Sequence, residues 1–120
     1  MKKVLQLEYR QSILVTRAEI LRSENFSVDS ILATDSNWKC QLSKTEVYGV
    51  IVVGHGSTWF DRRDLIAFFC ATFPNVPVVA LLRRSEEPFY DAAYNCPADE
   101  PVTWLKTIRK VLTVEAPNIP

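Results

Sequence analysis

The sequence is poor in the residues that usually reveal a chemical site: it has one histidine, three cysteines and no surplus of either charge. Its 14 basic and 14 acidic side chains cancel, so no overall field favours nucleic acid as a direct partner. Cys40, Cys70 and Cys96 are odd in number and widely spaced, which argues against a disulfide framework or a zinc site and is typical of reduced cytosolic thiols. No apolar run approaches the roughly 18 residues needed to cross a bilayer. We therefore expect a cytoplasmic protein without a membrane contact.

The overall composition is that of an ordinary globular domain, with 48% hydrophobic and 23% charged residues. No repeat, low-complexity tract or linker divides the chain. The start, Met1-Lys2-Lys3, leads into an apolar run too short for a signal peptide. We expect one domain over residues 1–120, with its core at about 3–112 and a C-terminal tail at 113–120.

Apolar residues follow a strand period in five places and a helical period between them. The continuous β-branched run at 48–53 is typical of a central parallel strand that is covered on both faces. The other strands are expected at 4–7, 26–32, 76–82 and 92–95. Helices are expected after the first strand, with Ser12 as N-cap and Asn25 as the left-handed residue at the end, near Trp38 and Leu42, at 60–73, and from Pro101 onward. The segment 83–90 leaves room for barely two helical turns.

Strands that alternate with helices predict an α/β fold with a parallel sheet between two helical layers. Right-handed crossovers leave few topologies, and the flavodoxin-like one is common at this size. We therefore expect a three-layer, doubly wound, five-stranded sheet in the order 2-1-3-4-5. The strand residues expected in one core are Leu5, Leu7, Val50, Val52, Val79 and Leu81.

Four segments, together with the order of elements, resemble the receiver domain of response regulators (CheY-like). They are Val4-Leu-Gln-Leu-Glu-Tyr-Arg10, residues 16–28 at the first helix and the entry of the second strand, Phe73-Pro-Asn-Val-Pro-Val-Val-Ala-Leu-Leu82, and the closing helix at 104–112. The resemblance spans residues 3–112. It implies a flavodoxin-like signalling module with partners such as a kinase or an output protein.

The resemblance also implies a phosphorylation pocket of five groups, and four of them are missing here. Glu8 fills one of two acidic positions that would hold Mg²⁺, but Tyr9 fills the other. Gly54 stands where the phosphorylated Asp would be, and Leu82 stands where a Ser or Thr would be. Cys96 or Ala98 replaces the lysine, depending on alignment. We expect a degenerate receiver that is not an enzyme, is not phosphorylated on aspartate, and has neither a metal nor another cofactor.

A second hypothesis uses the loop Gly54-His55-Gly56-Ser57. Backbone amides beside the two glycines could bind an anion at the start of a helix. His55 could act as a ligand or acid/base, or simply pack locally at the end of its strand. The His-Gly-Ser sequence also resembles a motif of sirohydrochlorin-type chelatases, which gives a small-ligand or chelatase-like enzyme as the alternative function.

The surface expected to contact partners follows the fourth strand and includes the last helix. Basic residues there form either a positive strip or ordinary solvated helix faces, and the aromatic residues either anchor a partner or fill the gap left by a short connection. The partner is another signalling protein or a second copy. The residues assigned to this surface are Arg83, Arg84, Phe89, Tyr90, Lys106 and Arg109.

Overall fold

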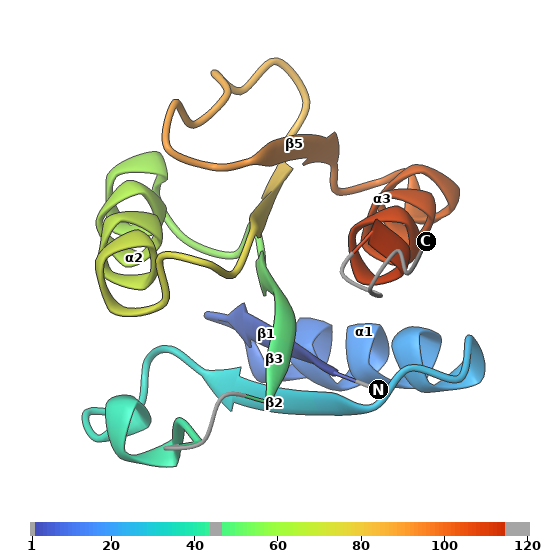
Figure 1. Ribbon diagram of the computed structural model, residues 1–120. Helices are drawn as coiled ribbons and strands as arrows, with labels where there is room; N and C mark the ends of the chain where they lie inside the picture. The colour runs from blue at the N-terminus through green and yellow to red at the C-terminus, as the bar shows by residue number, and fades with distance from the viewer. Residues whose placement is uncertain (1, 44–46, 115–120) are drawn as a thin grey trace.

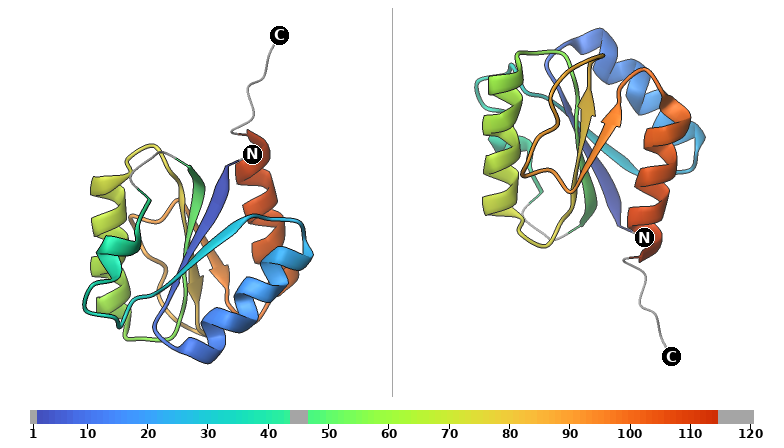
Figure 2. Two further views of the ribbon diagram at one scale, coloured as in Figure 1. Left: turned by 90° about the horizontal axis from the view of Figure 1, so that it is seen from below. Right: turned by 90° about the horizontal axis from the view of Figure 1, so that it is seen from above.

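The computed structural model describes residues 2–43 and 47–114, which form a parallel five-stranded sheet between two layers of helices (Figures 1 and 2). The strand order is β2-β1-β3-β4-β5, so the predicted flavodoxin-like α/β architecture is confirmed. Within the described ranges, no helix is long and apolar enough to cross a membrane. The elements are β1 (Lys3–Glu8), α1 (Gln11–Ser23), β2 (Val28–Leu32), the 3₁₀ helix η1 (Trp38–Gln41), β3 (Tyr48–Val53), α2 (Trp59–Thr72), β4 (Val78–Leu82), β5 (Tyr94–Pro97) and α3 (Pro101–Val114).

Two apolar clusters lie on opposite faces of the sheet, one under α2 and η1 and the other under α1 and α3 (Figure 2). The prediction of a single core is therefore wrong, although all six strand residues are buried. Leu5 pairs with Ile51, so Leu5 and Leu7 face α2, while Val50 and Val52 face α1 and α3. Side chains alternate along a strand, and the register that assigns each residue to a face is not visible in one sequence.

The first helix confirms one local expectation and corrects another. Asn25 has a φ of 67°, the left-handed conformation expected after the helix. Ser12 is not the N-cap, because α1 begins at Gln11 after Arg10 and has no side-chain cap. The Ser12 carbonyl instead accepts a hydrogen bond from Thr16 Oγ1 at 2.9 Å, inside the helix.

The connection between β4 and β5 contains no helix, whereas its short length had predicted a truncated or irregular one. Asn95 fixes it by accepting a hydrogen bond from the Phe89 amide at 2.9 Å and donating one to the Phe89 carbonyl at 3.1 Å. The connection runs alongside α2 (Figure 2). It leads into β5 two residues later than predicted, because Leu82 at the end of β4 pairs with Pro97.

Candidate functional site at the carboxyl edge of the sheet

The carboxyl ends of β1 and β3 meet at one edge of the sheet, where open α/β folds place their sites. The Gly54 amide donates to the Leu7 carbonyl at 2.8 Å and so ties the two strand ends together. The next residue of β1, Glu8, is fully buried beneath the loop that follows β3. The structure thus brings Glu8 and the Gly54–Ser57 loop together, as the sequence predicts.

The Glu8 carboxylate accepts four hydrogen bonds. Its Oε1 atom accepts from the amides of Tyr9 and Gly56, both at 2.8 Å. Its Oε2 atom accepts from the His55 amide at 3.2 Å and from Arg17 Nη1 at 2.9 Å. A buried carboxylate is tolerated only when it is paired and hydrogen-bonded in this way. The backbone amides that could bind an external anion therefore bind the protein's own carboxylate.

Gly54 and Gly56 are required by this arrangement because there is no space for a side chain. A Cβ atom on Gly54 would lie 1.9 Å from Glu8 Oε2, and one on Gly56 would lie 2.2 Å from Glu8 Oε1. An aspartate at position 54 could not coexist with the present position of Glu8. The missing phospho-acceptor and the buried Glu8 are thus two aspects of one local structure.

The residues present do not fit the Mg²⁺ that the resemblance implies. Mg²⁺ needs free carboxylate oxygens in octahedral geometry, whereas both Glu8 oxygens are engaged. The Arg17 guanidinium also places a positive charge beside them. Within residues 2–43 and 47–114, no group of three or more His, Cys, Asp or Glu side chains is arranged to hold a metal ion.

His55 is half-buried next to this ion pair, and its Nδ1 atom lies 3.4 Å from Arg17 Nη2. Burial lowers the pKa of His55; Glu8 opposes this shift, and the positive charges of Arg17, Arg62 and Arg83 add to it. The imidazole is therefore neutral at pH 7. Because a guanidinium can only donate, Nδ1 is the acceptor and the ring proton is assigned to Nε2.

Tyr9 turns away from the crevice toward α2. Its hydroxyl donates to the Asp61 carbonyl at 3.4 Å. Burial, with a smaller effect of the Asp61 charge, raises the pKa of Tyr9 to about 12. The residue in the second acidic position therefore supplies no anion to the site.

A second buried arginine, Arg62 of α2, supports the same edge beneath β4. Its side chain is fully buried and donates to the Leu81 carbonyl at 3.1 Å and the Ser57 carbonyl at 3.2 Å. It forms an ion pair with Glu86. Burial alone would raise the pKa of Glu86, but hydrogen bonds from Arg62 and the Arg83 amide lower it below its usual value. The β4–β5 connection is thereby fixed to the β3–α2 loop.

The residues at the expected Ser/Thr and Lys positions add no polar group to the edge. Leu82 is half-buried and packs against the α2-side cluster. Cys96 is buried in the α3-side cluster, and its thiol donates to Thr107 Oγ1 at 3.5 Å. Its burial against α3 does not support the assignment of Cys96 to the pocket. Ala98 follows the end of β5, where its amide donates to the Leu82 carbonyl at 2.8 Å.

The six residues assigned to a contact surface do not form one surface. Phe89 is only 2% exposed, so its assignment to the surface is corrected, whereas Tyr90 is 99% exposed. Arg83 donates to the Ser57 carbonyl, and Arg84 is exposed. On α3, Lys106 is exposed, and Arg109 pairs with Glu24, the residue that caps the end of α1, at 2.6 Å. Arg109 therefore belongs to the α1–α3 side of the molecule.

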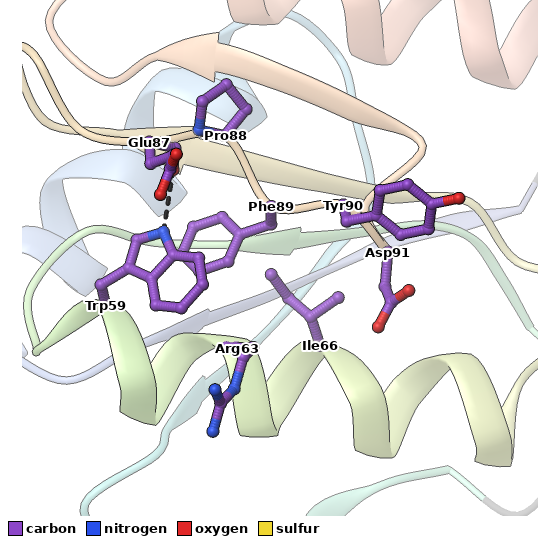
Figure 3. Close-up of a pocket in the computed structure, with 8 residues that line it drawn as sticks. All are labelled: Trp59, Arg63, Ile66, Glu87, Pro88, Phe89, Tyr90 and Asp91. Carbon is purple, nitrogen blue, oxygen red and sulfur yellow. Dashed lines mark hydrogen bonds between the residues drawn. The ribbon is translucent and has the colours of Figure 1, made fainter.

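A groove of about 360 Å³ lies between α2 and the β4–β5 connection (Figure 3). Trp59 and Phe89 stack in it with ring centroids 5.0 Å apart and planes 10° apart. The Trp59 indole donates to the Glu87 carbonyl at 2.8 Å, which holds the connection against α2. Figure 3 shows the Tyr90 ring directed away from this stack. Phe89 thus fills the space of the absent helix, and Tyr90 is left at the rim.

The buried roles of Arg17 and Arg62 were not predicted, although the sequence contains a signal for them. The buried positions of α1 are Leu14, Arg17, Ala18 and Leu21, and those of α2 are Arg62, Leu65, Ile66 and Phe69. Each arginine therefore occupies the core-facing stripe of its helix at the usual spacing of three and four residues. The spacing therefore places Arg17 and Arg62 inside, with the apolar residues of their helices.

No family model and no curated protein matches this sequence. Among solved structures, the response regulator TrrA of Thermotoga maritima, in complex with Mg²⁺-BeF, is similar with a TM-score of 0.73 and 14% identity over 93% of this chain and 100% of TrrA. A CheY-like receiver domain protein from Methanospirillum hungatei is similar with a TM-score of 0.73 and 15% identity over 95% of each chain. The chemotaxis protein CheY4 of Vibrio cholerae is similar with a TM-score of 0.69 and 20% identity over 93% of this chain and 99% of CheY4. The chain thus has the fold of CheY-like response-regulator receiver domains.

Proposed function

We propose that this protein is a receiver-like signalling module that acts by contact with other proteins and is not switched by aspartyl phosphorylation. One observation carries the proposal: the Glu8 carboxylate occupies the loop amides and the space above Gly54 that an acceptor aspartate would need. Acyl-phosphate formation needs a carboxylate nucleophile, and phosphoryl transfer needs a divalent ion. The Glu8 carboxylate at this edge is engaged by Arg17 and three backbone amides, and Gly54 has no side chain, which supports the proposal.

The buried charges also favour a single state of the carboxyl edge. Phosphorylation switches work by adding a charge that new partners can bind. Here the Glu8 carboxylate already lies at this edge, paired with the Arg17 guanidinium. A module of this kind would present its contact surface constantly, or change it only when a partner binds.

The contact surface that we propose is the β4–β5 connection beside α2. Tyr90 and Arg84 are exposed in this connection, and Tyr90 also lines the groove in Figure 3. Exposed aromatic and arginine side chains contribute strongly to protein interfaces. The partner is a signalling protein, such as a kinase or an output protein, or a second copy of the chain. The free state of all three cysteines agrees with a cytoplasmic location.

The alternative, an anion-binding or chelatase-like site in the Gly54–Ser57 loop, has less support. The amides of His55 and Gly56 already donate to Glu8. The single imidazole faces a guanidinium, and within residues 2–43 and 47–114 no group of three or more His, Cys, Asp or Glu side chains is arranged around it as metal ligands.

The proposal is tested by adding Mg²⁺ and beryllofluoride to the ¹⁵N-labelled protein, with TrrA treated in parallel as the control. We expect shifts in TrrA and none at the Glu8, Gly54 or Leu82 amides here. Acetyl phosphate should add no mass to this protein or to its Gly54→Asp variant, whose new side chain would collide with Glu8. A phosphoryl adduct that hydroxylamine removes from the wild-type protein would overturn the proposal.

A further inference from the structure

A second groove, separate from that in Figure 3, lies between α1 and the start of α3. Its volume is about 300 Å³. Ile13 and Ile20 of α1 form one apolar wall, and Pro101 and Trp104 of α3 form the other. Small-molecule sites begin at roughly this volume and combine apolar walls with a few convergent polar groups.

The polar lining of this groove includes the hydroxyl residues Ser12 and Thr16, but its nitrogen donors come from Arg17 and His55. Arg17 is 4% exposed, and one of its terminal nitrogens binds Glu8 while the other faces His55 Nδ1. This contact places the imidazole proton on Nε2, so the ring carries a hydrogen-bond donor. A buried guanidinium and a neutral imidazole thus line a groove that is otherwise mostly apolar.

The charges around the groove favour one negative charge and disfavour several. His55 feels the positive charges of three arginines, Arg17, Arg62 and Arg83, which oppose the negative charge of Glu8. Two exposed carboxylates, Asp99 and Glu100, immediately precede the lining residue Pro101 in the chain and add negative charge at this end of α3. A dianion such as phosphate would leave the apolar walls unused, whereas a monoanion with an apolar body uses both parts of the groove.

We propose that this groove binds a small monocarboxylic acid with an apolar body. The carboxylate lies at Arg17 and His55, and the body packs against Ile13, Ile20 and Trp104. Arginine suits this ligand because its guanidinium presents several donors to a carboxylate in a fixed geometry. The inference rests on the groove alone and holds whether or not the protein acts as the contact module proposed above.

Binding of a carboxylate in this groove should also affect the groups that hold Glu8, namely Arg17 and the amides of His55 and Gly56. Arg17 is the only side chain in the described part of the chain seen to pair with Glu8, so a second carboxylate on its guanidinium competes for the same charge. The amides of His55 and Gly56, which also hold Glu8, would respond. A ligand bound elsewhere would leave these two amides unchanged.

The test is an NMR titration of the full-length ¹⁵N-labelled protein with hexanoate, and with hexanamide as the uncharged control of similar shape. We expect saturable shifts at the Trp104 indole and at the His55 and Gly56 amides, and at least tenfold tighter binding of hexanoate than of hexanamide. Inorganic phosphate should produce no such shifts. Equal affinities, or stronger binding of phosphate, overturn the proposal.

Variants separate this groove from other surfaces. Ile13→Trp and Ile20→Phe fill the groove and should weaken hexanoate binding at least tenfold. Val15→Trp, on the same helix but outside the groove, should bind normally. His55→Phe keeps a ring of similar shape without its donor, so it should weaken hexanoate and hexanamide binding alike, while Arg17 retains the preference for hexanoate. Unchanged binding in a groove-filling variant that melts as the wild type does would show that hexanoate binds elsewhere.

Discussion

Arg17 Nη1 lies 2.9 Å from Glu8 Oε2, and both side chains are buried. Through this pair α1 is fixed to the end of β1, and the remaining bonds of Glu8 fix the loop after β3. An ion pair that has lost its hydration stabilises a fold little in total, but removal of one partner leaves an uncompensated buried charge. The arrangement is therefore rigid and sensitive to single substitutions.

The first prediction concerns that sensitivity. Arg17→Met should lower the free energy of unfolding by about 3–5 kcal/mol, because Glu8 would remain buried without its counter-ion. Arg22→Met, at an exposed position of the same helix, should change it by no more than about 0.5 kcal/mol. Urea denaturation followed by circular dichroism measures both. Equal effects of the two substitutions would contradict the role given to the pair.

The second prediction concerns the central strand. Val52 is fully buried in β3, so Val52→Asp should cost several kcal/mol and prevent soluble folding. Val102→Asp, in the first turn of α3 where the side chain is 69% exposed, introduces the same charge and should leave the protein folded. Soluble expression and a melting curve distinguish the two. A Val52→Asp protein with native stability would refute the place of β3 in the sheet.

The order of strands and helices could be predicted because it depends on local patterns. The β-branched run of β3 and the spacing of Leu14, Ala18 and Leu21 in α1 identify element types directly. Pro101, predicted as the first residue of the last helix, begins α3. The division of the core between two faces could not be predicted, because it depends on the pairing of Leu5 with Ile51.

The sequence predicted which groups of the phosphorylation pocket are missing, but not which interactions take their place. The sequence shows that Gly54 lacks a carboxylate, but the four bonds of Glu8 depend on the conformation of the loop backbone. Similarly, Phe89 and Tyr90 are neighbours of similar type in a segment without a helix. Only the stacking of Phe89 on Trp59 decides which of the two is buried.

The third prediction concerns pH. The pKa of His55 is lowered in the folded protein from an ordinary value of 6.5, mainly by burial. The imidazole of the unfolded chain therefore binds a proton more readily than that of the folded protein. The contribution of His55 to stability is complete above pH 6.5 and is lost as the pH falls toward the folded-state pKa. The slope for one proton is at most about 1.4 kcal/mol per pH unit.

Denaturation curves between pH 5 and pH 7 measure this dependence. His55 is the only histidine, so His55→Gln should flatten the curve in this range, where unperturbed carboxyl groups remain ionised. An unchanged slope in the variant would mean that His55 has the same pKa in the folded and unfolded states.

The last prediction separates the two neighbouring aromatic residues of the β4–β5 connection. Phe89 stacks on Trp59, lies 5.1 Å from the Arg62 guanidinium carbon and is buried. Phe89→Ala should therefore cost about 3–5 kcal/mol of stability through the cavity it leaves. Tyr90→Ala removes a ring that is almost fully exposed, so it should change stability by no more than about 0.5 kcal/mol.

The same two variants test whether this surface acts by contact. If Tyr90 anchors a partner, Tyr90→Ala should weaken self-association in sedimentation experiments, or binding of a purified partner, at least tenfold while the melting temperature stays unchanged. Val15→Ala removes another exposed apolar side chain, from α1, and should leave binding intact. If Tyr90→Ala lowers the melting temperature as much as Phe89→Ala while association is unaltered, both rings are structural. The contact surface would then have to lie elsewhere on the molecule.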